Sequence, residues 1–110
     1  MINVSIVRDH SGFIWQFSIE GHAEYDGQGN DIVCAAASVT AYTAVGALGD
    51  LAGIKNCHTE NDGFLFCSLP ADLSEKQKQT AGIILETTVI GFKQIELEYA
   101  EFLKVMEEEV

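Results

Sequence analysis

Apolar side chains occupy every second position over residues 13–20, and this is the most regular pattern in the chain. A period of two is typical of a strand with one buried face. Residues 2–7 alternate in a similar way, and the polar and glycine positions at 9–12 favour a turn between the two runs. The chain is therefore expected to open with a β-hairpin.

A loop and a long helix are predicted next. Residues 23–30 have no apolar period and contain two glycines, which favours a loop. Asp31 is expected to be the N-cap of the helix, because its carboxylate can accept hydrogen bonds from N–H groups of the first turn. Residues 32–34 would then be the first three helical positions, and the helix would run to about Gly53. No charge occurs over residues 32–49, so we expect this helix to be buried nearly all round, partly by a second subunit.

The same uncharged run is long enough to be considered as a membrane span. It is rich in Ala, Gly, Thr, Ser and Val, and no cluster of Lys or Arg flanks it. We therefore interpret it as a core helix and predict no membrane partner. The opening MINVSIVRDH lacks the basic and then apolar segments of a signal peptide, which favours a cytoplasmic protein.

An Asp-Gly pair at 62–63 predicts a second hairpin, because this dipeptide suits turns that need positive φ. In the expected register His58 faces Cys67. Successive side chains of a strand point to opposite faces, so Cys57 would lie on the other face of the sheet from Cys67. This register argues against a disulfide between the two cysteines.

The last third of the chain has helical spacing. Ser74 with Gln77 matches a capping box, and apolar residues then keep helical spacing as far as position 106. One unbroken helix over this stretch would be about 50 Å long. Such a helix is too long for a domain of this size, so we expect a break near Gly91 or around 99–100. Residues 102–106 fit either a short helix or an edge strand.

The element order ββαββα predicts an α+β fold. We expect a two-layer sandwich in which the helices pack on one face of a largely antiparallel four-stranded sheet. A length of 110 residues with 47% hydrophobic residues suits one domain, over residues 1–110.

Charge and cysteine content narrow the possible partners. The chain has 6 Lys and Arg against 17 Asp and Glu, a formal charge of -11, which disfavours binding to nucleic acid. A basic peptide or protein is the better partner, although solubility alone also explains such a charge. Three cysteines without a Cys-x-x-Cys pair are typical of a reducing compartment. Adjacent Cys57 and His58 suit a single zinc ion poorly, so no metal and no cofactor are predicted.

Cys34 and His22 carry the candidate chemistry. A cysteine nucleophile needs a thiolate, a nearby base and access to its substrate. At the start of a helix, free N–H groups and the helix dipole favour an anion and can stabilise an oxyanion. His22 lies twelve residues before Cys34, and the glycine-containing segment between them is long enough to fold back.

The residues alone leave a structural interpretation open. A cysteine that begins an apolar helix is often a packing residue. Asp31 is interpreted first as a helix cap and second as a residue that orients His22. Ser38 lies one turn beyond Cys34 on the same helix face, and Gly21 permits a tight turn beside His22.

The residues "GHA" at 21–23 and "GNDIVCAAAS" at 29–38 resemble the ribosomal-processing cysteine protease family Prp. The resemblance implies that Cys34 is the nucleophile and His22 the general base. It implies that Gly21, Asp31 and Ser38 are the other motif positions around the site. It also implies a homodimer that removes the short N-terminal extension of a large-subunit ribosomal protein.

Two other functions fit the same residues. One is a non-catalytic acidic dimer that binds basic ribosomal proteins. The other is a cysteine hydrolase with a different acyl substrate, because a Cys/His dyad specifies acyl chemistry and leaves the acyl group open. Replacement of Cys34 separates a protease from a binding protein, since only the protease depends on the thiol.

Overall fold

A computed structural model describes residues 1–21 and 30–110 of the chain. It contains two helices and five strands in the order ββαββαβ, with the bounds that follow. The elements are β1 (Ile2–Arg8), β2 (Ile14–Glu20), α1 (Asn30–Ala52), β3 (His58–Asn61), β4 (Phe64–Ser68), α2 (Glu75–Glu98) and β5 (Leu103–Glu109).

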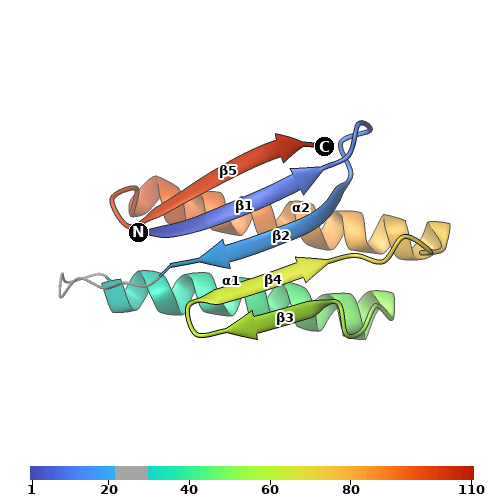
Figure 1. The fold of residues 1–110 in the computed structure, drawn as a ribbon, viewed down its shortest axis with the longest axis horizontal. Helices are drawn as coiled ribbons and strands as arrows, with labels where there is room; N and C mark the ends of the chain where they lie inside the picture. Colours follow the sequence, from blue (N-terminus) through green and yellow to red (C-terminus); the bar gives the residue numbers. More distant parts are fainter. Residues whose placement is uncertain (22–29) are drawn as a thin grey trace.

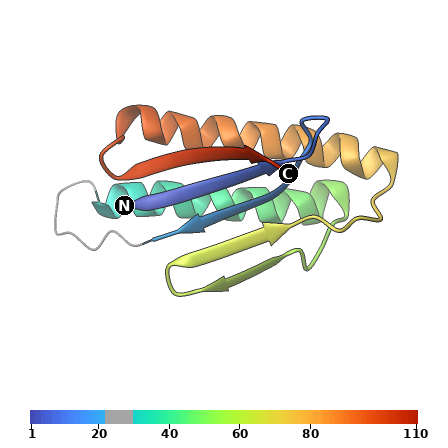
Figure 2. The same cartoon turned by 45° about the horizontal axis from the view of Figure 1, so that its top comes forward.

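The strands form one mixed sheet in the order β3-β4-β2-β1-β5, and both helices cover the same face of it (Figures 1 and 2). This arrangement confirms the α+β sandwich with helices on one face. The prediction of four strands in the order ββαββα is wrong, because β5 adds a fifth strand that pairs in parallel with β1. All other neighbouring strands are antiparallel.

The edge strand is therefore the correct alternative for the C-terminal segment. Helix α2 ends at Glu98, and Tyr99 caps it by donating its N–H to the carbonyl of Ile95. The predicted break around 99–100 is confirmed. Leu103 is completely buried opposite Ile2, so burial of an alternating apolar face favours the strand.

The core lies between the sheet and the helices. Ile6 and Phe17 face each other across β1 and β2, and Cys67 of β4 follows on the other side of Phe17. All three side chains are buried, and the ring of Phe17 lies 6.2 Å from that of Phe92 on α2. The alternation along the first hairpin is broken between Val7 and Arg8, where the register shifts.

Helix α1 begins two residues earlier than the sequence predicts. It starts at Asn30, so Asp31 is its second residue and the prediction of Asp31 as N-cap is wrong. Cys34 is consequently the fifth helical residue rather than the third. The free N–H groups of a helix belong to its first four positions, so they lie just before Cys34.

The inner face of α1 packs in the core, where Val33, Ala41 and Leu48 are completely buried. Its outer face is different: Ile32 is 59% exposed and Leu51 is 71% exposed. The expectation of burial all round is therefore wrong for the single chain. By length and composition alone, residues 32–52 of α1 are apolar enough to cross a membrane, a property that core helices of soluble proteins share.

The capping box at the start of α2 is confirmed. Gln77 N–H donates to Ser74 Oγ at 3.1 Å, and Ser74 N–H donates to Gln77 Oε1 at 3.0 Å. The predicted break at Gly91 is wrong, because α2 continues through it to Glu98, and Gly91 lies where α2 packs closely on α1. A Cβ at Gly91 would lie 3.3 Å from Cγ2 of Thr40 on α1.

The predicted register of the second hairpin is correct, since His58 faces Cys67. The prediction that Cys57 and Cys67 lie on opposite faces of the sheet is wrong, because their Sγ atoms lie 3.5 Å apart. Both cysteines are free thiols. Strand alternation does not extend to Cys57, which precedes β3 and follows Asn56 at φ 59°. The Cys57 side chain packs against the core.

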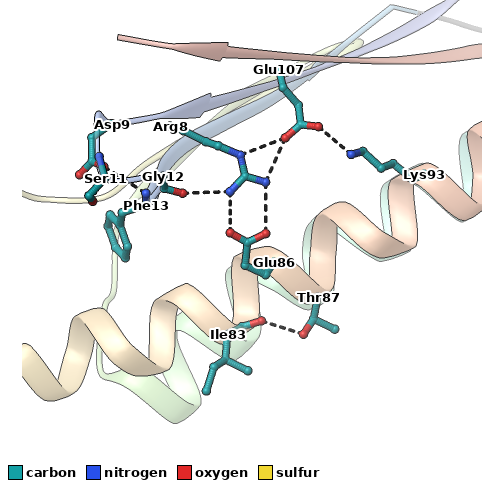
Figure 3. A network of polar contacts seen from close by, with 10 residues as sticks. All are labelled: Arg8, Asp9, Ser11, Gly12, Phe13, Ile83, Glu86, Thr87, Lys93 and Glu107. Atoms are coloured by element: carbon teal, nitrogen blue, oxygen red, sulfur yellow. Dashed lines mark hydrogen bonds and ion pairs between the residues drawn. The ribbon is translucent and has the colours of Figure 1, made fainter.

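An ionic network joins the sheet to α2 at Arg8 (Figure 3). Arg8 donates two hydrogen bonds to the Glu86 carboxylate, at 2.6 and 3.1 Å, and one to Glu107 at 3.0 Å. Lys93 Nζ lies 2.6 Å from the other Glu107 oxygen. The hydrogen bond from Lys93, followed by that from Arg8, lowers the pKa of the Glu107 carboxyl group.

Glu107→Gln is expected to lower the free energy of unfolding at neutral pH by about 1 kcal/mol or less, because the network is partly exposed. A lowered pKa in the folded state stabilises the protein above the ordinary glutamate pKa of about 4.3. This stabilisation is lost as the pH falls through the folded-state pKa. Urea unfolding should therefore give a higher free energy of unfolding for the wild type than for the variant at neutral pH, and a smaller difference near pH 3. Glu108→Gln, on the next residue of β5, is the control, and an advantage equal at both pH values would contradict the prediction.

Candidate active site

Cys34 lines a cavity of about 130 Å³ at the end of the sandwich where α1 begins. Three parts of the chain form its walls: the ends of β1 and β2, the first half of α1, and the turn of the β3–β4 hairpin. In Figure 1 these parts meet at the same end of the molecule. A half-buried thiol in such a cavity is accessible to a substrate that enters from solvent.

Ser38 follows Cys34 by one helical turn and lines the same cavity. The shared helix face that the sequence predicts is therefore confirmed. Ala37 lies between them on the inner side and is buried, so α1 packs closely against the sheet here. The small side chain leaves room for the cavity beside the thiol.

Gly21 contributes the sheet side of the cavity. Its φ is 119°, a conformation that L side chains rarely adopt, and a Cβ here would overlap the carbonyl oxygen of Met1. Its N–H donates to the carbonyl of Gly63 at 2.9 Å, which links the end of β2 to the turn of the second hairpin. The backbone conformation at Gly21 therefore favours glycine, while the predicted turn beside His22 continues outside the described residues.

Tyr42 and Glu60 close the rim of the cavity between α1 and β3. The Tyr42 hydroxyl donates a hydrogen bond to the Glu60 carboxylate, and this bond raises the pKa of Tyr42. Asn61 and Phe64, on either side of the hairpin turn, also line the cavity. The site therefore combines a thiol with apolar surface and one carboxylate at its edge.

No sequence pattern pointed to these rim residues. The Asp-Gly pair predicts the hairpin but does not indicate that its turn reaches Cys34. The spacing of Tyr42, two turns after Cys34, was the available signal, since residues at that spacing share a helix face.

His22 lies outside the described residues, as does the predicted loop apart from Asn30, and no side-chain position is described for Asp31. Neither His10 nor His58 lines the cavity. His10 pairs with Glu109 at 2.9 Å, and His58 lies 3.8 Å from Glu60. Of the three cysteines, all within the described part of the chain, Cys34 alone lines this cavity.

Comparison with known proteins identifies the type of site. Residues 1–104 match the family model described as cysteine protease Prp. The chain belongs to the cysteine protease Prp family. The ribosomal processing cysteine protease Prp of Bacillus subtilis is 31% identical over 107 residues, which cover 96% of each chain. A Prp of Staphylococcus aureus is 29% identical over 106 residues, with 96% of this chain and 97% of the relative covered.

Solved structures agree with this membership. The S. aureus Prp in complex with a substrate peptide has a TM-score of 0.84 at 26% identity, with 98% of this chain and all of that chain covered. The same protease with a covalently linked product peptide has a TM-score of 0.82 at 27% identity, with the same shares of both chains covered. A protein of Streptococcus mutans, SMU.848, has a TM-score of 0.84 at 26% identity, with 100% of this chain and 96% of that chain covered.

The protein is therefore a cysteine protease with the Prp fold, and the five-stranded mixed sheet is the form of this fold in this chain. A covalently linked product in a related structure fits chemistry in which a cysteine becomes acylated. In this chain, Cys34 is the cysteine that shares a cavity with Gly21 and Ser38, two of the motif positions.

Proposed function

We propose that this protease removes the short N-terminal extension of a large-subunit ribosomal protein, with Cys34 as nucleophile and His22 as general base. The observation that carries the proposal is the position of Cys34 in a cavity of a chain that belongs to the Prp family. Curated relatives in that family are named for ribosomal processing. Gly21, which directly precedes His22 in sequence, lines the same cavity and supports the pairing of His22 with Cys34.

The proposed reaction has two stages. His22 takes the proton of the Cys34 thiol, the thiolate attacks the scissile carbonyl carbon, and an oxyanion forms near the start of α1. The intermediate collapses, the C–N bond breaks, and His22 gives its proton to the leaving amine. Water then attacks the thioester, with His22 taking its proton, and releases the new carboxyl terminus while Cys34 regains its thiol.

Intact-mass spectrometry tests the substrate directly. The protease is incubated with a large-subunit ribosomal protein that still carries its N-terminal extension. Loss of a single discrete N-terminal peptide is the expected result. A stable complex with an unchanged mass would support a binding protein instead, and hydrolysis only of small acyl esters or amides would support a different acyl substrate.

The negative charge provides a second, independent prediction. Ribosomal proteins are basic, so a protease of formal charge -11 is expected to attract them over long range while it avoids rRNA. Raising the ionic strength from about 0.01 M to 0.15 M shortens the Debye length from about 30 Å to 8 Å. We expect kcat/KM to fall over this range while kcat changes little. A neutral substrate peptide is the control, and equal salt dependence for both substrates would contradict steering by charge.

A homodimer is part of the same proposal, and an exposed apolar face of α2 supports it. Ile83, Ile90 and Leu97 recur every seven residues along α2 and are 71%, 61% and 77% exposed. Seven residues are close to two helical turns, so these side chains form one apolar stripe. A stripe of this kind on a soluble protein is typical of an interface.

Ile90→Glu is therefore expected to convert the dimer to a monomer. Sedimentation equilibrium measures the mass, and Ile90→Leu, which keeps an apolar side chain at the same position of the stripe, is the matched control that should remain a dimer. The dimer proposal would be contradicted by a wild-type protein that sediments as a monomer at micromolar concentration.

A further inference from the structure

Two of the three cysteines form a pair that the proposed protease reaction does not use. The Sγ atoms of Cys57 and Cys67 lie 3.5 Å apart, and both residues are free thiols. Cys57 lines a second cavity, of about 320 Å³, beside Val45 and Gly49 of α1. Cys34 lies eleven residues before Val45 on the same helix, which corresponds to about 16 Å along its axis. The pair is therefore separate from the Cys34 site.

The backbone around the pair suits a disulfide. The carbonyl of Cys57 accepts a hydrogen bond from Ser68 N–H at 2.9 Å, so the chain at Cys57 still runs beside β4. Since His58 and Cys67 are directly opposed, Cys57 is one position away from direct opposition. Strand spacing and rise place such neighbours about 6 Å apart at Cα, within the usual disulfide range. The sulfur atoms need to approach by roughly 1.5 Å to reach bonding distance.

The two thiols differ in access. Cys57 is half-buried and faces the second cavity, together with Lys55 and His58. Cys67 is 1% exposed, and burial raises the pKa of its thiol. A small oxidant therefore reaches Cys57 first, while Cys67 stays protected until its neighbour has been oxidised. This order is typical of a reactive thiol with a resolving partner.

We propose that Cys57 and Cys67 form an oxidation site, in which peroxide converts the two thiols to a reversible intramolecular disulfide. The Cys57 sulfur attacks one oxygen of hydrogen peroxide, the O–O bond breaks, and Cys57 becomes a sulfenic acid while water is released. The Cys67 sulfur then attacks the sulfenic sulfur, the S–O bond breaks, and a second water leaves with the Cys67 proton. Two thiols are oxidised by one peroxide, and two molecules of a small thiol reverse the change.

The disulfide would join the start of β3 to β4, at the opposite end of the hairpin from the turn that lines the Cys34 cavity. In a reducing compartment the pair is expected to stay as thiols. The product of oxidation at this pair is a disulfide, which small thiols can reduce. A buried thiol without a neighbouring thiol cannot form such a disulfide within the chain.

The test uses the full-length Cys34→Ala variant, so that only this pair can react. The variant is treated with hydrogen peroxide, unfolded, alkylated with N-ethylmaleimide and weighed intact. The expected product has the mass of a single chain that has lost two hydrogen atoms, and it carries no maleimide. Treatment with dithiothreitol before alkylation should restore two maleimide additions. Because Cys34 is absent, the result does not depend on the proposed protease reaction.

A second variant, Cys34→Ala with Cys57→Ser, is the matched control. It is expected to keep Cys67 as a thiol, which takes one maleimide after unfolding. The proposal would be overturned if the first variant kept both thiols under peroxide that fully oxidises Cys34 in the wild type. Disulfide-linked dimers or irreversible oxygen addition at Cys57 would overturn it equally, because either shows that Cys67 does not resolve the oxidised thiol.

Discussion

Cys34→Ala is expected to abolish cleavage of the ribosomal-protein precursor, with kcat lowered by roughly 10⁴-fold or more, as for nucleophile replacements in other proteases. Alanine has no group that can form the thioester, so the first stage of the reaction has no route. Binding should persist, because the cavity is formed mostly by other residues, among them Tyr42 and Phe64. The measurement pairs a cleavage assay with the Kd of a peptide that spans the cleavage site.

Cys57→Ala is the matched control for this change, because it removes a half-buried thiol outside the cavity. Its kcat should stay close to the wild-type value. Cys34→Ser adds a second comparison, since a hydroxyl keeps the size of the side chain but is a far weaker nucleophile without stronger activation. Residual cleavage by Cys34→Ala at more than a tenth of the wild-type rate would exclude Cys34 as the nucleophile.

The sequence predicted those features that depend on neighbouring residues. Alternation identified the first hairpin, the Asp-Gly pair identified the second, and the capping box identified the start of α2 at Ser74. The spacing of Cys34 and Ser38 placed both on the face of α1 that lines the cavity. Local physical rules suffice in these cases, because the deciding contacts are formed within a few residues of each other.

The features that were missed depend on contacts between distant parts of the chain. The hydrogen bond from Tyr42 to Glu60 requires α1 to lie over β3, and no local sequence pattern predicts that packing. Cys57 precedes β3, so strand alternation does not place its side chain, and its sulfur lies next to that of Cys67. The parallel strand β5 requires α2 to end at Glu98 and the chain to return beside β1.

Helix α1 shows a third kind of limit. Its sequence is apolar all round, but only one face packs against the sheet and α2 within a single chain. The hydrophobic pattern therefore indicates total burial without showing whether the same chain or a second copy supplies it. Its exposed residues, such as Val39 at 62%, extend the apolar surface that the proposed dimer would cover.

Gly21→Ala is expected to have the largest effect on stability among substitutions of a single glycine. A Cβ at φ 119° is strained, and it would also overlap the carbonyl oxygen of Met1, which belongs to backbone at the start of β1. Strain alone costs about 1–2 kcal/mol. Displacement of β1 and of the bond from Gly21 to Gly63 should raise the total loss of unfolding free energy to about 3 kcal/mol or more. Thermal and urea unfolding measure this loss.

Gly12→Ala separates the two causes, because Gly12 also has positive φ, at 92°, but open space where its Cβ would lie. It should lose only the strain energy, about 1–2 kcal/mol, and retain cleavage activity. Gly21→Ala should in addition lose most of its cleavage well below its melting temperature, because Gly21 lines the Cys34 cavity and directly precedes His22. Equal losses of stability in the two variants would show that the approach of Met1 to Gly21 does not constrain the site. Full activity of folded Gly21→Ala would show that the geometry at Gly21 is not needed to bring His22 to Cys34.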